Sequence, residues 1–349
     1  MTAKEALTRL DAWMFDRKLC GWDPYDGLST PMARYLTSKS QRQLLVQLVK
    51  RSPVAARRML SVQQHQLTKS MALAVSGLTR ANWLPDAAAR RAQLVRDLRG
   101  RRTSGGWGYQ FDVQTRWGFY PADSPNAVVT AFVVEAIAED LGAAERSEIV
   151  HWLTHEMWAG THFRYVPGND ALVHNASMLC ARALARLHAG HPLIQEAIAT
   201  CTTSLTARRL WPYGESRGLE WVDNFHTAYV IDCLVDLEQE YPEVSPVLDL
   251  AVERYFADCF TDDGTPLYFA RRSGPVDMHN IATALYLTQK LRDSGRGVPR
   301  LSENCLAYAL KFQRADGAFV TSSRAIPFMR WNQAHMYLAL SETAASDAG

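Results

Sequence analysis

Three features are missing from this sequence: a long uncharged hydrophobic run, an excess of charge of one sign, and any CxxC cysteine pair. The longest apolar stretch, around residues 125–134, is far shorter than the about 20 residues that cross a bilayer. We therefore expect no membrane span. The 38 basic and 36 acidic residues give a net charge of only +2, which predicts no general attraction to nucleic acid.

The first residues of the chain resemble an amphipathic helix. Lys4, Glu5, Arg9 and Asp11 recur at helical spacing, and the apolar core of a secretory signal is missing. We therefore expect a cytoplasmic protein. The six cysteines are scattered among apolar residues, as in MLCARAL, so we expect reduced, buried thiols, no metal site and no cofactor.

A repeat of about fifty residues organises the chain. Each of five segments has an amphipathic helix, a turn rich in glycine and aromatic residues, a polar residue, and a second helix rich in alanine and threonine. The turns begin at Gly105, His162, Leu210, Asp262 and Ala315. An alignment of the second helices places five polar residues in one column, at spacings of 49, 48, 56 and 53: Asn126, Asn175, Asp223, His279 and Asn332.

One helical hairpin per repeat predicts an all-α fold, an (α/α)6 toroid in which small residues let the inner helices pack around a central axis. Outer helices are expected near residues 86–99, 144–157, 193–207, 245–258 and 301–313. We expect a single domain over residues 1–349. Its hairpins run from about residue 40 to residue 343, the first of them near 40–78, and residues 1–38 form an N-terminal cap.

In such a ring the inner helices begin at the same mouth, so the polar column converges on one cavity. Asp223 and His226 share a helix face and form a candidate acid/base pair. Simple helix capping is the alternative for the asparagines, and a satisfied buried side chain is the alternative for the histidines. The side chains expected to bind substrate in this region are Asn126, His174, Asn175, Asn224, His279, Asn280, Asn332 and His335.

The turns supply further candidates. Asp26 and Asp112 could act as catalytic carboxylates, since two carboxylates across a cleft perform glycoside hydrolysis, although such residues also shape turns. Flat aromatic rings suit stacking on sugars and equally suit isoprenoid chains. The aromatic candidates are Trp22, Tyr25, Trp107, Trp211 and Tyr213, and Arg116 could bind an anionic group unless it lies on a solvated face.

Three motifs carry a family resemblance. ALKFQRADGAF, from Ala309 to Phe319, resembles the glutamine–tryptophan repeat of the squalene-cyclase and protein-prenyltransferase superfamily. GWDPYDGL, from Gly21 to Leu28, together with DNFHTAYV, from Asp223 to Val230, is similar to a bacterial branch of these toroids found among polysaccharide-biosynthesis proteins. The resemblance implies an α/α toroid over most of the chain.

The chemistry of the best-known members is not matched. The sequence has no DxDD acid of the terpene cyclases and no DDxxD motif. The pairs Asp232–Cys233 and Asp258–Cys259 are adjacent, so the Asp-x-Cys zinc arrangement is missing too. We therefore expect a protein of polysaccharide biosynthesis that acts on or binds a small-molecule or oligosaccharide ligand, as a hydrolase, lyase or epimerase. The alternatives are a terpenoid enzyme with an unconventional acid and a non-catalytic binding or scaffold protein.

Overall fold

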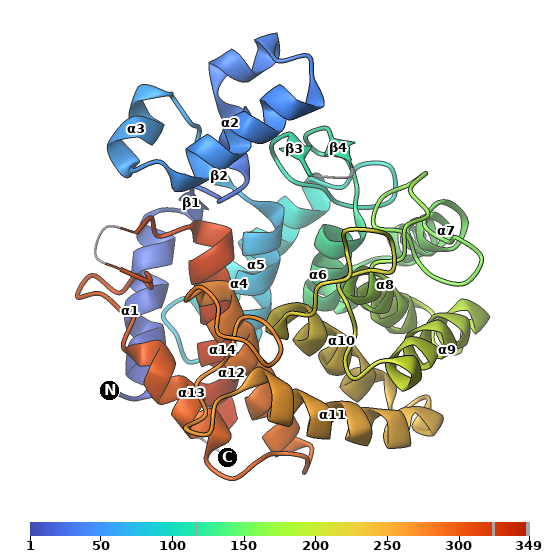
Figure 1. Ribbon diagram of the computed structural model, residues 1–349. Coiled ribbons are helices and arrows are strands. Elements are labelled where there is room, and N and C mark those ends of the chain that lie inside the picture. Colours follow the sequence, from blue (N-terminus) through green and yellow to red (C-terminus); the bar gives the residue numbers. More distant parts are fainter. Residues whose placement is uncertain (116–117, 323–324, 347–349) are drawn as a thin grey trace.

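A computed structural model describes residues 1–115, 118–322 and 325–346 (Figure 1). Helices dominate these ranges, and they form two concentric layers around one axis. This arrangement confirms the all-α toroid that the repeat predicts.

The inner layer is a closed ring of six helices. Each inner helix packs against the next along the chain, and the last packs against the first. Nearly every residue of these helices is buried, because each has neighbours on both sides and an outer helix behind it. The inner helices are α4 (Thr68–Arg80), α6 (Ala127–Ile137), α8 (His174–Leu187), α10 (Asn224–Leu237), α12 (Met278–Asp293) and α14 (His335–Ser346).

The outer layer covers this ring with helices that expose one face to solvent. Five of them lie where the apolar stripes predict them. Their bounds are Ala87–Gly100 for α5, Ala143–His151 for α7, Pro192–Ala207 for α9, Ser245–Cys259 for α11 and Leu301–Leu310 for α13.

The N-terminal helix takes the sixth outer position. In place of a separate cap, α1 (Ala3–Asp16) packs against α14, so the two ends of the chain together form one hairpin. Leu7, Leu10 and Met14 are fully buried on one stripe of α1, which explains why this helix joins the ring. The hydroxyl of Tyr337 donates a 2.8 Å hydrogen bond to Asp11 across the joint.

The hairpin expected near residues 40–78 does not form, because only α4 enters the ring. α2 (Lys39–Arg51) and α3 (Val54–Met59) lie together beside the ring, at the top of Figure 1. In α2 only Val46 and Val49 are buried, a stripe too narrow for an outer helix. Two short antiparallel ribbons lie nearby: β1 (Cys20–Gly21) with β2 (His65–Gln66), and β3 (Val113–Gln114) with β4 (Phe119–Tyr120).

Side-chain caps start several inner helices. Asn126, Asp223 and Asp277 each accept a hydrogen bond from the backbone N–H three residues on. The polar column of the sequence is therefore not one structural position: Asn175 and His279 are the second residues of α8 and α12. The residues of the column occupy different helix positions because the turns between outer and inner helices differ in length. Asn332 lies in the π-helical turn Met329–Ala334, ahead of α14.

In the described ranges, no helix is both long enough and apolar enough to cross a bilayer.

Candidate functional site

The inner helices all begin at the same end of the ring, around a cavity of about 720 Å³. Residues from the first turns of α4, α6, α8, α10 and α12 line it, and α2 supplies one wall. This volume is that of a site for a small molecule or short oligosaccharide. The lining is rich in rings, namely Tyr25, Tyr109, Phe111, Tyr165, Tyr213, Trp221, Phe225, Tyr229, Tyr268, Phe269 and Trp331.

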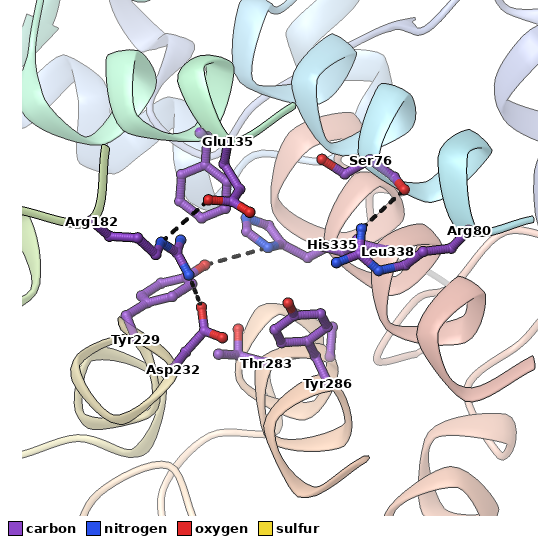
Figure 2. A pocket seen from close by; sticks show the side chains of 12 residues that line it. Ser76, Arg80, Glu135, Arg182, Tyr229, Asp232, Thr283, Tyr286, His335 and Leu338 are labelled. Carbon is purple, nitrogen blue, oxygen red and sulfur yellow. Dashed lines mark hydrogen bonds and ion pairs between the residues drawn. The ribbon is translucent and has the colours of Figure 1, made fainter. Parts of the chain in front are cut away.

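The opposite end of the axis is closed by charged side chains (Figure 2). Arg182 lies 2.6 Å from Asp232 and 3.6 Å from Glu135. The pocket between them holds only about 30 Å³, enough for a water molecule. Tyr229 lines both spaces and therefore separates them. The space for a larger ligand is at the mouth.

Backbone hydrogen bonds fix the tyrosines of the cavity. The first N–H of α6 donates to the carbonyl of Tyr165, that of α8 to Tyr213, and that of α10 to Tyr268, over 2.9–3.1 Å. Each turn is thereby attached to the helix of the preceding repeat, with its tyrosine ring in the cavity wall. Of these three tyrosines, Tyr213 is a candidate site residue from the sequence. Tyr165 and Tyr109 belong to the same recurrence of aromatic residues in the turns, and the sequence-based candidates do not include Tyr268.

The tryptophans of the turns, Trp107 and Trp211, hold the turns against the outer helices and do not line the cavity. The indole N–H of Trp107 donates to the Leu98 carbonyl, and that of Trp211 donates to the Cys201 carbonyl. Both rings are almost fully buried against the preceding outer helix and do not line the cavity. They anchor the turns, so the sequence-based expectation that they bind substrate is not met. Trp22 is likewise buried beside α2, with its indole bonded to the carbonyl of Val62.

Asp223 and His226 form the oriented pair that the sequence predicts. His226 Nδ1 lies 2.7 Å from Asp223 Oδ2, and both residues line the cavity. Asp223 also accepts the backbone N–H of His226 and, over 2.9 Å, the indole N–H of Trp221. A carboxylate that only accepts requires the proton on Nδ1, which leaves Nε2 of His226 as the basic nitrogen.

A second polar group joins three helices. His279 Nε2 lies 2.6 Å from the hydroxyl of Tyr229, which is 3.4 Å from Nδ1 of His335. The imidazoles of His279 and His335 stack with centroids 3.9 Å apart. Burial, reinforced by the nearby Lys69 and Arg330, lowers the pKa of both histidines well below the usual value, so both are neutral at pH 7. His279 lines the mouth cavity, whereas His335 lines the small pocket.

Among the predicted asparagines, only Asn175 lines the cavity. Its buried Oδ1 has no hydrogen-bond partner among the residues that the structure describes. The side chains of the other predicted asparagines form hydrogen bonds with the backbone of caps, turns and helix ends. Asn126 caps α6, and His174 bonds Glu215 over 2.8 Å outside the cavity. The side-chain amide of Asn224 donates to the carbonyl of Cys259 at the end of α11, and those of Asn280 and Asn332 donate to turn carbonyls.

The two turn carboxylates proposed as catalytic lie outside the cavity. Asp26 is buried in an ion pair with Arg57, 2.9 Å away, and burial raises its pKa to about 7 against the opposing effect of that arginine. Asp112, just before β3, accepts the N–H of Ala122, just after β4, and so joins the two segments that flank this ribbon. Tyr25, by contrast, lines the cavity with its ring edge-on to Trp331. Arg116 lies outside the described residues.

Sequence reasoning missed the basic residues of this site. Lys69 and Arg330 line the cavity, and Arg330 forms a bidentate ion pair with the buried Asp23, at 2.6 and 2.9 Å. Lys69 stands out in the sequence as the one charged residue of α4 before its last residue, Arg80. The described residues contain no cluster of histidine, cysteine and acidic side chains that could hold a metal ion.

Comparison with known proteins is informative only at the level of structure. No protein-family model matches the chain, and no curated protein is similar in sequence. A possible member of the GH105 family from Klebsiella pneumoniae aligns with 82% of this chain and 84% of its own, at 12% identity and a TM-score of 0.60.

Two further structures show the range of proteins with this shape. Cellobiose 2-epimerase from Bacillus thermoamylovorans is 10% identical over 82% of this chain and 90% of its own, with a TM-score of 0.56. A type II terpene cyclase from Scytonema, in complex with geranylgeranyl dihydroxybenzoate, is 14% identical over 80% and 86%, with a TM-score of 0.53. At these identities the likeness concerns the fold: the chain is an α/α toroid, like these carbohydrate-active proteins and this type II terpene cyclase.

Proposed function

We propose that the protein is an enzyme that transfers protons on a saccharide bound in the mouth cavity, as an epimerase or lyase. The observation that carries this proposal is the 2.7 Å contact between His226 Nδ1 and Asp223 Oδ2 in the cavity wall. A carboxylate that orients an imidazole leaves Nε2 available to remove a proton from a bound ligand.

The second proton-transfer group of the proposal is His279 with Tyr229. Burial raises the pKa of Tyr229 above its usual value, so its hydroxyl stays protonated and can donate to Nε2 of His279. The ring of Phe225 contacts both imidazoles, with centroids 4.0 Å from His226 and 4.7 Å from His279. Two imidazoles in contact with one apolar ring suit removal of a proton by one group and its delivery by another.

Hydrolysis by two carboxylates is less well supported. Such glycosidases need two acidic side chains across the bound sugar. Among the described lining residues Asp223 is the only carboxylate, and it is held by His226 and Trp221. The aromatic lining remains suited to sugar rings, and several carbohydrate-active enzymes share the fold.

A terpenoid enzyme and a non-catalytic binding protein are the alternatives. Carbocation chemistry is disfavoured because Lys69, Arg330 and Arg272 line the cavity and would repel a developing positive charge. We place the proposed activity in cytoplasmic polysaccharide biosynthesis, following the resemblance of the GWDPYDGL and DNFHTAYV segments, and without nucleic acid as a partner.

The test is a solvent-exchange assay. The purified protein is incubated in D₂O with uronic acid oligosaccharides, neutral disaccharides and prenyl diphosphates, and the products are analysed by NMR. We expect deuterium incorporation or a new double bond in a saccharide. His226→Ala should abolish it, whereas the control His155→Gln, an exposed histidine on the outer surface, should keep it.

The assay also separates the alternatives. A saccharide that raises the melting temperature without any exchange or turnover would support a binding protein and contradict the proposal. Turnover of a prenyl diphosphate alone would favour the terpenoid enzyme. Turnover that survives in His226→Ala would remove this residue from the mechanism.

A further inference from the structure

Lys69 is a buried lysine that forms no ion pair with any of the residues that the structure describes. It is the second residue of α4 and lines the cavity, and only 2% of its surface is exposed. Its ammonium nitrogen lies 3.9 Å from the centroid of the Phe132 ring and 5.4 Å from that of Tyr229. In the described parts of the chain Lys69 makes no hydrogen bond and no ion pair. A buried amine in this state either loses its proton or awaits an anion.

The surroundings of Lys69 are positive rather than neutral. Asp23, a buried carboxylate nearby, is already bound by two guanidinium nitrogens of Arg330, Nε and Nη2. Burial, with Arg330 adding to it, lowers the pKa of Lys69 well below the usual value. Lys50 and Arg272 lie at the edge of the same cavity, and the inner helices point their N-termini toward it, which also favours an anion.

Other titratable groups near Lys69 do not offset this charge. His279 and His335 are neutral, and the phenol of Tyr229 stays protonated, so none of the three supplies a negative charge. Asp223 is the only carboxylate among the described lining residues, and it is bound to His226. Among the described residues, no negatively charged side chain is therefore left to pair with Lys69.

We propose that this charge comes with the ligand: the substrate is an acidic saccharide, and the carboxylate of a uronic acid residue binds Lys69. The inference rests on the proposed function and names its substrate class. An ion pair buried among aromatic rings gives stronger binding than the same pair at the surface. It also explains why the amine is left without a partner in the protein.

The carboxylate of the bound uronic acid would also make it feasible for His226 to remove a proton from the neighbouring ring carbon. Nε2 takes the proton from C5, the ring carbon that bears the carboxylate, and the electron pair of the broken C–H bond moves into the carboxylate group. The extra negative charge is stabilised by the Lys69 ammonium. Return of a proton to the other face of C5 gives the epimer. Departure of the oxygen at C4, with a proton delivered to it, gives instead a C4=C5 double bond.

The test compares matched ligands. Binding of a glucuronic acid disaccharide, its methyl ester and the corresponding neutral disaccharide is measured by calorimetry on the whole protein. The wild type should bind the acid at least about tenfold more tightly than the ester or the neutral sugar, as expected for a charged hydrogen bond. Because the ester changes only the ligand, this comparison does not depend on whether any variant folds.

Variants then assign the effect to Lys69. Lys69→Met should weaken binding of the acid about 10- to 100-fold and leave the neutral sugar within about twofold, while the control Lys39→Met, an exposed residue of α2, should change neither. Equal affinity of the wild type for acid and ester would overturn the inference and leave the proposed function standing. An acid preference that persists in Lys69→Met would also overturn it. Failure of all three sugars to bind would contradict the proposed function itself.

Discussion

At the scale of single residues, the orientation of one imidazole determines the chemistry open to this cavity. His226 is held by Asp223 through its ring and its backbone N–H, and its ring lies between Tyr213 and Phe225. Asp223 thus serves as helix cap and as the group that selects the tautomer.

Asp223→Asn separates these two tasks. Asparagine still caps α10, so the melting temperature should change by only a few degrees, but its amide no longer requires a proton on His226 Nδ1. We expect kcat in the solvent-exchange assay to fall by about 10²- to 10⁴-fold. The control Asp112→Asn, in a loop outside the cavity, should stay within about twofold. A fully active Asp223→Asn enzyme would exclude His226 as the base.

The buried histidines make stability depend on pH. His279 and His335 have lowered pKa values in the folded protein, so below the unfolded pKa of about 6.5 the unfolded chain binds more protons. Their contribution is complete above that pH and is lost on acidification. Between pH 6.5 and 5.5 each should lower the free energy of unfolding by about 1 kcal/mol, because the unfolded histidine is half protonated at pH 6.5 and almost fully protonated at pH 5.5.

Urea unfolding at pH 7.5, 6.5 and 5.5 measures this dependence. The double variant His279→Gln/His335→Gln should show a shallower slope than the wild type, because the two titrating groups are gone. Identical slopes would mean that both histidines titrate alike in the folded and unfolded chains, contrary to their burial.

At the scale of residues, the sequence predicts the pair of Asp223 and His226 but not which turn rings line the cavity. Asp223 and His226 are recognisable because residues three apart share a helix face, and this local rule is independent of the rest of the fold. Trp107 and Tyr109 stand two residues apart in the same turn, yet one is buried against an outer helix and the other lines the cavity. Which ring faces which side depends on hydrogen bonds to other repeats, which no local pattern contains. The pairing of Asp23 with Arg330, at opposite ends of the chain, is likewise set by ring closure.

At the scale of elements, the segments outside the ring complete the cavity. Asp23, in the loop after β1, binds Arg330 in the turn before α14, and that turn also carries Trp331. The indole of Trp331 donates to Asp277, the cap of α12, over 2.9 Å. One buried ion pair therefore connects the N-terminal loop, the last turn and the cavity wall.

Arg330→Met should destabilise the protein by about 3–5 kcal/mol, because Asp23 would be left buried without its partner. Urea unfolding at pH 7 measures the change. The double variant Asp23→Asn/Arg330→Met should recover at least half of the loss, since no charge then remains buried alone. If the single and double variants are equally unstable, the cost comes from packing and not from charge.

At the scale of the whole molecule, closure of the ring brings together helices far apart in the sequence. α4 and α14 meet at Gly77, where a Cβ atom would lie 2.5 Å from the ring of Tyr337. The repeat predicts that such a joint exists, because hairpins of this period must close or end in a cap. It does not predict that α1 rather than a residue 40–78 hairpin completes the ring, since both segments are amphipathic.

Gly77→Ala tests the closeness of this joint. Alanine favours a helix by about 1 kcal/mol over glycine, but the clash with Tyr337 should reverse the sign and cost about 1–3 kcal/mol. The control is Gly100→Ala at the end of α5, where a Cβ would meet nothing within 4 Å, and stability there should be unchanged or slightly raised. A stabilised Gly77→Ala protein would show that α4 and α14 are further apart.

The most direct test of the account is a crystal structure of the protein with a glucuronic acid disaccharide. The account predicts density for the sugar in the mouth cavity, stacked on the turn tyrosines, with its carboxylate at Lys69 and a ring carbon facing Nε2 of His226. A sugar bound elsewhere on the molecule, or a cavity that stays empty at saturating ligand, would contradict the claim that this cavity is a saccharide site.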